Sequence, residues 1–302
     1  MYAIIHLSSI TEINNFAQCT TKHPLVAVFD LSKQDQYDEE DIRISTDFYS
    51  MIFKNYCAST VEYGRQSVDF QEASLMCVGP KQVINMSNKG VKEEEEITGW
   101  GLFFHPDLLH GTTLGDKIHS YTFFSYEISE ALHLSPKEKQ ILTDCIKKIE
   151  AELHENIDQH SQTLLVSNIE LILNYCTRYY DRQFITRKSS NSKIISQVEN
   201  IVKNHYQQAP YATPSLLSVH YLAQKVHLSP NYLSDLLKKE TGMNAQDYIH
   251  YYLIENAKNK LLNSDDTVGQ IAYSLGFEYP QYFSRLFKRK TGRTPIEFRN
   301  TN

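Results

Sequence analysis

Apolar residues near the C-terminus recur at helical spacing, over residues 268–275 and again over residues 283–287. Gly276 lies between these two stretches, where a residue with positive φ commonly ends a helix. Pro280 suits the first turn of the following helix, because its missing N–H group has no helical partner to lose there. Two short helices joined by a tight turn form a helix-turn-helix, so the pattern predicts such a unit over residues 267–291.

The same hydrophobic pattern occurs once earlier and predicts a second unit over residues 219–241. The two copies align with an offset of 49 residues before the turn and 50 after it, so the later turn carries one additional residue. A repeat of this kind indicates two copies of one supersecondary structure. Residues 244–262 have a helical stripe of their own and predict a connecting helix ~27 Å long, at ~1.5 Å per residue.

The second helix of each unit carries polar and basic residues opposite its apolar stripe. Arginine and lysine neutralise backbone phosphates, while arginine and glutamine form paired hydrogen bonds with base edges in the major groove. A connecting helix of the predicted length suits two recognition helices in adjacent major grooves, which lie ~34 Å apart. The expected DNA contacts are Asn231, Tyr232, Ser234, Asp235, Lys238, Gln281, Tyr282, Ser284, Arg285, Lys288 and Arg289.

Arg285 is the strongest candidate among them for a base or phosphate contact, because a guanidinium binds either group with two hydrogen bonds. Tyr232 and Tyr282 are compatible with a DNA contact or with a partly buried position. The residues expected in the core of these helices are Leu233, Leu236, Leu237, Phe283, Leu286 and Phe287.

This region resembles the DNA-binding domain of the AraC/XylS transcription regulators over roughly residues 193–300. The matching residues are Gly276-Phe277, Tyr282-Phe283-Ser284-Arg285-Leu286-Phe287-Lys288, Gly292-Arg293-Thr294-Pro295 and Phe298-Arg299. One departure is Pro280-Gln281, since a serine often precedes the tyrosine in that family. The departure concerns one phosphate or base contact and leaves the expected fold unchanged. The resemblance implies double-stranded DNA as a partner.

Charge divides the chain into two parts. Residues 1–190 contain 17 basic and 27 acidic residues, a net charge of −10, whereas residues 191–302 contain 13 and 9, a net charge of +4. A basic C-terminal part joined to an acidic N-terminal part is typical of a nucleic-acid module attached to another domain. The length of 302 residues also favours two domains.

Short apolar runs in the N-terminal part predict strands. They lie at residues 25–31, 48–63, 67–70, 74–78, 82–86 and 97–104, whereas residues 1–23 show too little pattern to assign. Closely spaced short strands favour a small barrel or sandwich. The resemblance implies a cupin-like barrel over about residues 24–125, although the sequence holds no cupin motif of its own.

A pair of helices follows the strands. Ser135 and Glu138 form a capping box at the start of the first helix, and a second helix is expected over residues 162–180. In the related family such a pair, here about residues 135–182, often dimerises the protein; packing against its own barrel is an equally good interpretation. Residues 188–192 are polar and predict a linker, followed by a helix over residues 194–206.

No chemistry other than DNA binding stands out. The five cysteines contain no Cys-x-x-Cys spacing, which disfavours zinc and disulfide frameworks and indicates a reducing compartment. His105, His110 and His119 lack the spacing and glutamate of a metal-binding cupin, so no metal or other cofactor is expected. Neither a signal peptide nor a membrane span is evident, which predicts a cytoplasmic protein.

The sequence therefore predicts an α+β protein that is not an enzyme. A sensing or dimerising domain over residues 1–187, with a cupin-like barrel and a helical pair, precedes an all-α domain over residues 193–300 with two helix-turn-helix units. The expected function is sequence-specific transcription regulation in response to a small molecule, in a homodimer. The alternatives are a regulator without a ligand, whose N-terminal domain only dimerises or binds another protein, and a metal-dependent cupin enzyme. RNA polymerase is a further partner compatible with the resemblance.

Overall fold

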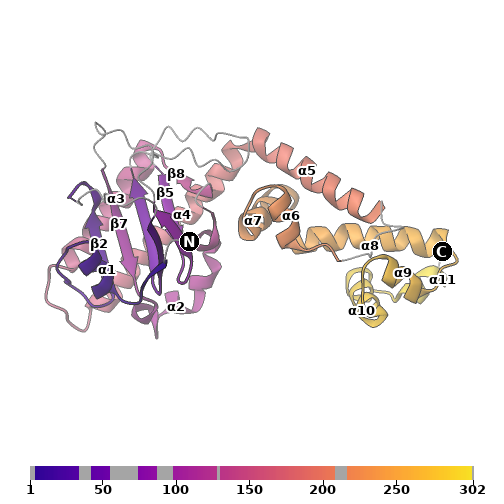
Figure 1. The fold of residues 1–302 in the computed structure, drawn as a ribbon, viewed down its shortest axis with the longest axis horizontal. Helices are drawn as coiled ribbons and strands as arrows, with labels where there is room; N and C mark the ends of the chain where they lie inside the picture. The colour runs from indigo at the N-terminus through magenta and orange to yellow at the C-terminus, as the bar shows by residue number, and fades with distance from the viewer. Residues whose placement is uncertain are drawn as a thin grey trace. The chain divides into compact units, whose positions relative to one another are not determined.

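A computed structural model describes residues 4–33, 42–54, 74–86, 98–127, 130–207 and 216–300. The chain divides into two compact units, Met1–Thr186 and Arg187–Asn302 (Figure 1). The first unit contains both sheets, and the elements described in the second are all helices. No helix among the described residues is long and apolar enough to cross a membrane.

A five-stranded antiparallel sheet forms the centre of the first unit, with the order β2-β7-β4-β5-β8. These strands are β2 (Val26–Asp30), β7 (Gly99–Phe104), β4 (Tyr49–Lys54), β5 (Ser74–Val78) and β8 (Leu132–His133). The strands expected at residues 25–31, 74–78 and 97–104 correspond to β2, β5 and β7. The expected pair at residues 48–63 is described only as far as β4, and the one at residues 67–70 lies outside the described residues.

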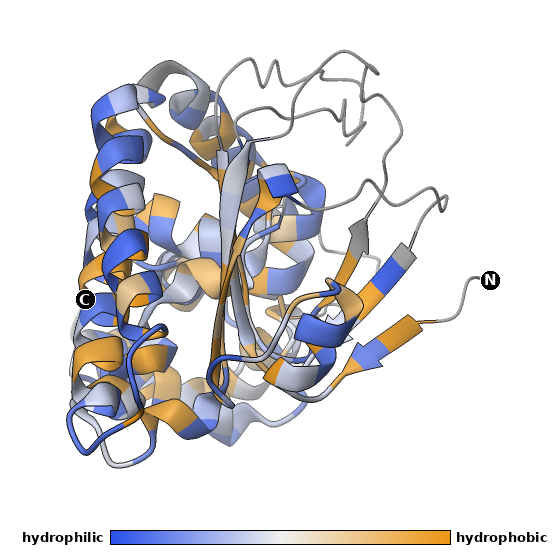
Figure 2. Ribbon diagram, turned by 90° about the vertical axis from the view of Figure 1, so that its left-hand side faces the viewer, coloured by the Kyte–Doolittle hydropathy of each residue, from blue (hydrophilic) through white to orange (hydrophobic). Residues whose placement is uncertain are grey.

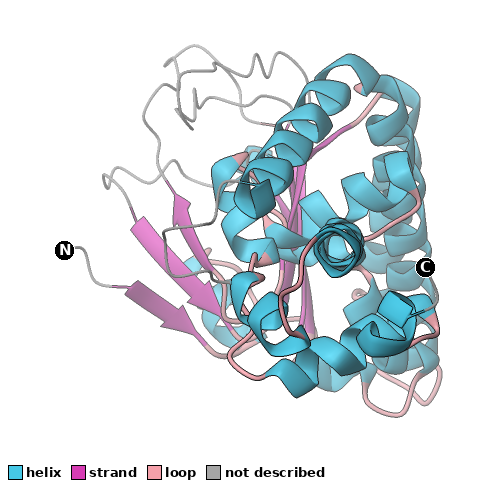
Figure 3. Ribbon diagram, turned by 90° about the vertical axis from the view of Figure 1, so that its right-hand side faces the viewer, coloured by secondary structure: helices cyan, strands magenta, loops and turns pink. Residues whose placement is uncertain are grey.

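A smaller sheet with the order β1-β3-β6 packs on one face of the larger one (Figure 3). It contains β1 (Ile4–Leu7), β3 (Ile42–Thr46) and β6 (Val83–Met86), with helix α1 (Ile10–Phe16) beside it. The core between these layers contains buried residues from both sheets and from α1, namely Leu7, Ile10, Ile13, Ala27, Phe29, Ile44, Phe48 and Phe103. Neither β1, α1 nor β3 was predicted.

Helices α3 (Pro136–Glu152) and α4 (Ser161–Thr186) cover the opposite face of the larger sheet (Figure 2). The indole N–H of Trp100 on β7 donates to the Thr143 hydroxyl of α3 at 3.3 Å. Phe103, three residues further along β7, lies in the core between the sheets. Both faces of β7 are therefore buried, which explains why this strand is a continuous apolar run rather than an alternating one.

The expected cupin-like barrel is not seen among the described residues. Their strands form two separate sheets, and β2 and β8 are the edges of the larger one. Helices cover the face of that sheet opposite the smaller sheet. The coarser prediction, a mixed strand and helix unit followed by a helical unit, agrees with the structure.

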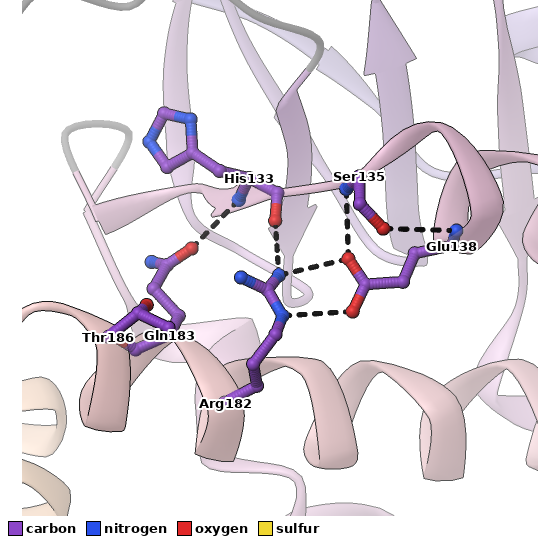
Figure 4. A network of polar contacts seen from close by, with 6 residues as sticks. All are labelled: His133, Ser135, Glu138, Arg182, Gln183 and Thr186. Carbon is purple, nitrogen blue, oxygen red and sulfur yellow. Dashed lines mark hydrogen bonds and ion pairs between the residues drawn. The ribbon is translucent and has the colours of Figure 1, made fainter.

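The C-terminal end of α4 is fixed to α3 and β8 by polar contacts (Figure 4). The Arg182 guanidinium donates to both carboxylate oxygens of Glu138, at 2.9 and 3.0 Å, and to the His133 carbonyl at 2.6 Å. The Gln183 side chain accepts from the His133 N–H at 2.8 Å. Glu138 also accepts from the Ser135 N–H at 2.8 Å, so the predicted capping box is present.

Short helical segments connect the strands and helices of the first unit. They are the 3-10 helices η1 (Leu31–Lys33), η2 (Pro106–Leu109), η3 (Ile118–Ser120) and η4 (Thr122–Ser125), together with α2 (Thr113–Lys117). Helix η2 begins directly after His105.

The second unit begins with α5 (Lys188–Gln207), which differs from the prediction of a linker at residues 188–192. Those polar residues form the first turns of a helix whose later residues Val198 and Val202 are fully buried. Polar residues at the start of a helix are compatible with helix formation, because tertiary packing of an apolar stripe supplies most of the stability. The boundary between the compact units falls at Arg187.

The remaining helices repeat one another as the sequence predicts. They are α6 (Val219–Lys225), α7 (Pro230–Thr241), α8 (Ala245–Asn263), α9 (Val268–Ser274), α10 (Pro280–Thr291) and α11 (Pro295–Asn300). In each helix-turn-helix unit the first helix has 7 residues and the second has 12. Gly242 and Gly292 end the second helices with the same positive φ of 79°. Both helix-turn-helix units pack into one core around α8.

The two turns contain equivalent residues with positive φ, and only one of them is glycine. Gly276 has φ of 93°, and His227, at the offset of 49, has φ of 56°. Each donates its N–H to a carbonyl three residues earlier, on Tyr273 and Gln224 respectively. Since a side chain disfavours this conformation, the first turn is strained where the second is relaxed.

Replacing His227 by glycine should therefore stabilise the second unit by about 1 kcal/mol, because the left-handed conformation costs glycine no steric energy. Thermal unfolding followed by circular dichroism measures the change. The matched reverse change, Gly276→Ala, should destabilise the unit by about the same amount. A lower melting temperature for His227→Gly would contradict this explanation of the turn.

Candidate nucleic-acid interface

Helix α10 separates buried and exposed residues along its length. Phe283 and Phe287 are fully buried, and their rings lie 5.7 Å apart in the core of the second unit. Tyr282, next to Phe283, is 56% exposed. Most of the polar residues of α10 that are predicted to contact DNA are exposed as well. These are Gln281, Arg285, Lys288 and Arg289, whereas Ser284 is half-buried.

Several polar residues of α10 have partners within the unit, among them Ser284 and Lys290. The Ser284 hydroxyl donates to the Pro280 carbonyl at 3.1 Å. The Lys290 ammonium donates to the Asp247 carboxylate of α8 at 2.7 Å, and this contact lowers the pKa of Asp247. Arg285, Lys288 and Arg289 therefore form the basic face that the sequence predicts.

Helix α7 places its candidate residues less uniformly. Asn231 and Lys238 are exposed, and Asp235 is half-buried. Tyr232 is only 4% exposed, in contrast to its counterpart Tyr282. The Ser234 hydroxyl accepts from the Ala245 N–H at 3.3 Å, at the first residue of α8. Tyr232 is thus buried in the fold, and the half-buried Ser234 has a hydrogen-bond partner in α8.

The two recognition helices also differ in charge. Position 285 of α10 is arginine, whereas the equivalent position 235 of α7 is aspartate, and Lys290 corresponds to Glu240. The acidic residues of α7 offset its two lysines, while α10 carries only basic charges. Because phosphate neutralisation depends on cationic side chains, α10 is better suited to bind the DNA backbone.

A pocket of about 360 Å³ lies beside α10. Its lining residues are His250 of α8 and Tyr282, Arg285, Leu286 and Arg289 of α10. The Gln246 side-chain nitrogen lies 2.8 Å from Nε2 of His250. Sequence reasoning missed His250, because a single histidine on a connecting helix has no motif around it; the i, i+4 spacing of Gln246 and His250 was the one available signal.

The last residues of the resembling signature have a structural role. The Arg299 guanidinium donates to the Leu261 carbonyl at 3.0 Å and to the Asp266 carbonyl at 2.7 Å. Phe298 packs edge-on against Phe287 with ring centroids 5.5 Å apart. Helix α11 therefore closes the end of α8 and the core of the second helix-turn-helix.

Two further exposed tyrosines lie near the residues predicted to contact DNA. Tyr273 at the end of α9 and Tyr279 before α10 are about half exposed, and Tyr279 contacts Tyr282 edge-on at 5.8 Å. A tyrosine hydroxyl is a common donor to phosphate. Both lie at the helix ends flanking the turn, outside the recognition helix on which the sequence analysis concentrated.

The first unit offers no comparable site among its described residues. No group of three histidine, cysteine or acidic side chains in the described parts is arranged to hold a metal ion. Nδ1 of His105 accepts from the Asp107 N–H at 3.2 Å, which caps η2. Cys77 and Cys176 are buried and hydrogen-bonded to each other, and burial raises the pKa of the Cys77 thiol. A buried thiol with a raised pKa reacts slowly.

The match to a known family model lies in the second unit. Residues 222–301 match the family model described as a helix-turn-helix domain. A solved transcriptional regulator from Chromobacterium violaceum, described as containing an AraC-type DNA-binding domain, is 24% identical; the match covers 37% of this chain and 94% of that one, with a TM-score of 0.31.

Curated relatives are also transcription regulators. The chain is 25% identical over 186 residues to YijO of Escherichia coli, described as an HTH-type transcriptional regulator, a match covering 62% of each. It is 38% identical over 78 residues to RhaS of Escherichia fergusonii, described as an HTH-type transcriptional activator, covering 26% of this chain and 28% of RhaS. The matches thus span less than two thirds of the length of each relative.

Proposed function

Since the second unit of this chain is a helix-turn-helix domain of the AraC/XylS type, we propose that the protein is a transcription regulator that binds double-stranded DNA. Residues 193–300 form the proposed DNA-binding domain. Recognition helices α7 and α10 enter adjacent major grooves, and α8 sets the distance between them. The cytoplasmic location expected from the sequence is part of this proposal.

The observation that carries the proposal is the separation of faces on α10. Its aromatic residues Phe283 and Phe287 are fully buried, while Arg285, Lys288 and Arg289 lie together on the exposed face. A packed helix that presents several cationic side chains outward suits a polyanionic groove.

A mobility-shift experiment with the full chain on genomic fragments tests this function. We expect saturable binding to particular fragments, with affinity that falls as salt rises, because bound phosphates displace counterions. For about six phosphate contacts, affinity should drop ~10³-fold between ~50 and ~200 mM salt. Absence of binding to every fragment at low salt would contradict the proposal, and equal binding to all would remove its sequence-specific part.

The first unit is proposed to sense a small molecule and to dimerise. Two features support a separate role for it: it is a compact unit with its own core, and it is acidic where the second is basic. Arg182 and Gln183 join the end of α4, which leads into the second unit, to β8. A ligand that displaced β8 would break the hydrogen bonds that Arg182 and Gln183 make with His133, and so alter the C-terminal end of α4.

Exposed apolar residues on α4 support the dimer. Leu164, Leu171 and Ile185 are 48%, 39% and 61% exposed, and their spacings of seven and fourteen place them on one stripe. Sedimentation equilibrium distinguishes a dimer from a monomer. A thermal-shift screen of metabolites, repeated in the mobility-shift experiment, distinguishes a sensor from a regulator whose first unit only dimerises or binds another protein. RNA polymerase remains a proposed partner of either form.

A further inference from the structure

The pocket beside α10 combines cationic and apolar walls. Arg285 and Arg289 line it, one helical turn apart, together with Tyr282 and Leu286. His250 is the one residue of this lining that comes from α8. Such a lining suits an anionic group that is attached to a small apolar one.

Hydrogen bonding defines how His250 presents its ring. With the imidazole neutral, the Gln246 amide donates to Nε2, and the ring proton is then on Nδ1. His250 is half-buried, so its ring has limited freedom to turn away. Both the neutral and the protonated ring therefore have an N–H group to donate.

Several charged groups face His250. Asp247 comes from its own helix, and Arg289 and Lys290 come from α10, with Lys290 paired to Asp247. Burial and the two cations lower the pKa of His250, while Asp247 opposes them. Arg285 and Tyr282 complete the charged and polar groups around the pocket. In the absence of an anion, the surroundings of His250 thus favour a neutral ring.

We propose that this pocket binds one phosphodiester group of DNA, with His250 of the connecting helix donating to the phosphate beside Arg285 and Arg289. The deoxyribose then lies against Leu286 and the Tyr282 ring. This inference rests on the proposed function and assigns α8 a direct role in binding, in addition to its role as a spacer. The bound chemistry is a phosphate, which a free phosphate ion would share.

The proposal couples DNA binding to proton uptake. A bound phosphate supplies the negative charge that the free pocket lacks, so it raises the pKa of His250. Protonated His250 is therefore more common in the complex than in the free protein. The affinity for DNA should increase as the pH falls through the pKa of the complex, and should level off below the pKa of the free protein.

Binding of the full chain to its selected DNA fragment, measured by fluorescence anisotropy from pH 5.5 to 8 in phosphate-free buffer, tests the proposal. We expect His250→Gln to lower the affinity at pH 6 on the order of tenfold, the size of one charge-assisted hydrogen bond, and to change it little at pH 8. His119→Gln, an exposed histidine of the first unit, is the matched control and should keep the wild-type pH profile.

An NMR titration of His250 in the wild-type chain gives a second measurement that does not depend on the variant folding. A pKa that rises when DNA binds supports the proposal, and inorganic phosphate alone should raise it less. A pKa that responds to inorganic phosphate but not to DNA would overturn it in favour of a free-anion site.

The outcomes separate this proposal from the proposed function. If the chain binds DNA and its pH profile is the same in His250→Gln as in the wild type, the pocket proposal is overturned and the DNA-binding function stands. If the chain binds no DNA fragment at any pH, both are overturned.

Discussion

Replacing Phe283 by alanine should cost the second unit about 3–5 kcal/mol of unfolding free energy, the usual effect of deleting a large buried aromatic side chain. Phe283 is fully buried, and its ring lies 5.5 Å from Phe277 and 5.7 Å from Phe287. Its loss leaves a cavity between α9 and α10, so the exposed face of α10 should lose its fixed geometry. DNA binding should weaken as well.

Chemical denaturation measures this effect with two signals. The chain contains a single tryptophan, Trp100, on β7 of the first unit, so its fluorescence reports that unit alone. Circular dichroism follows the helices of both units. We expect Phe283→Ala to shift the helical transition of the second unit and to leave the fluorescence transition in place.

The neighbouring residue provides the matched control. Tyr282 is 56% exposed, so Tyr282→Ala should change the unfolding free energy by less than about 1 kcal/mol. Equal destabilisation by both variants would show that the assignment of buried and exposed faces on α10 is wrong.

Replacing Arg285 by alanine should weaken specific DNA binding by about 1–3 kcal/mol, if this guanidinium binds a base. Arg285 is exposed at the centre of the basic face and lines the pocket shared with His250. Its stability effect should be small, because the side chain is outside the core. The dissociation constant for the selected fragment, measured at several salt concentrations, determines the loss.

The salt series also tells a base contact from a phosphate contact. Loss of a phosphate contact reduces the slope of log affinity against log salt by about one and weakens all fragments alike, whereas loss of a base contact reduces discrimination between fragments. Arg178→Ala controls for net charge, since Arg178 is an exposed arginine of the first unit. An unchanged affinity for Arg285→Ala would remove this residue from the interface.

Local signals predict the second unit well, because they repeat. The stop at Gly276, the proline at the start of α10 and the turn that is one residue longer all follow from steric preferences of single residues. Equivalent positions in the two copies also support one another. The positive φ of His227 follows from the same alignment of the two copies, because His227 is at the position of Gly276.

The first unit was harder to predict, because its elements depend on contacts distant in sequence. Helix α1 begins with the pattern Ser9-x-x-Glu12, a capping signal that is present but short. Strand β3 pairs with β1 in parallel, and no local turn links the two. The division into two sheets rather than a barrel depends on which face the helices cover, a property of tertiary packing that no short segment contains.

The buried and exposed faces of α10 were predicted from the helical spacing. Spacing correctly separated Phe283 and Phe287 from Arg285 and its neighbours. It could not show that Ser234 would bind the backbone of α8, nor that Tyr232 would be buried while Tyr282 is exposed. These differences arise from neighbours on other elements, which a helical period does not include. The pocket beside His250 was not predicted either, because its lining residues come from two different helices.

The two faces of α10 allow its sequence to change in two separate ways over evolution. Substitutions among Gln281, Arg285 and Lys288 change the exposed surface of the helix without disturbing Phe283 and Phe287, on which its folding depends. Under the proposed function, a duplicated unit with this division acquires new target sequences through single surface mutations, each near neutral for stability. The opposite charges at positions 235 and 285 show that the two copies have already diverged along this path.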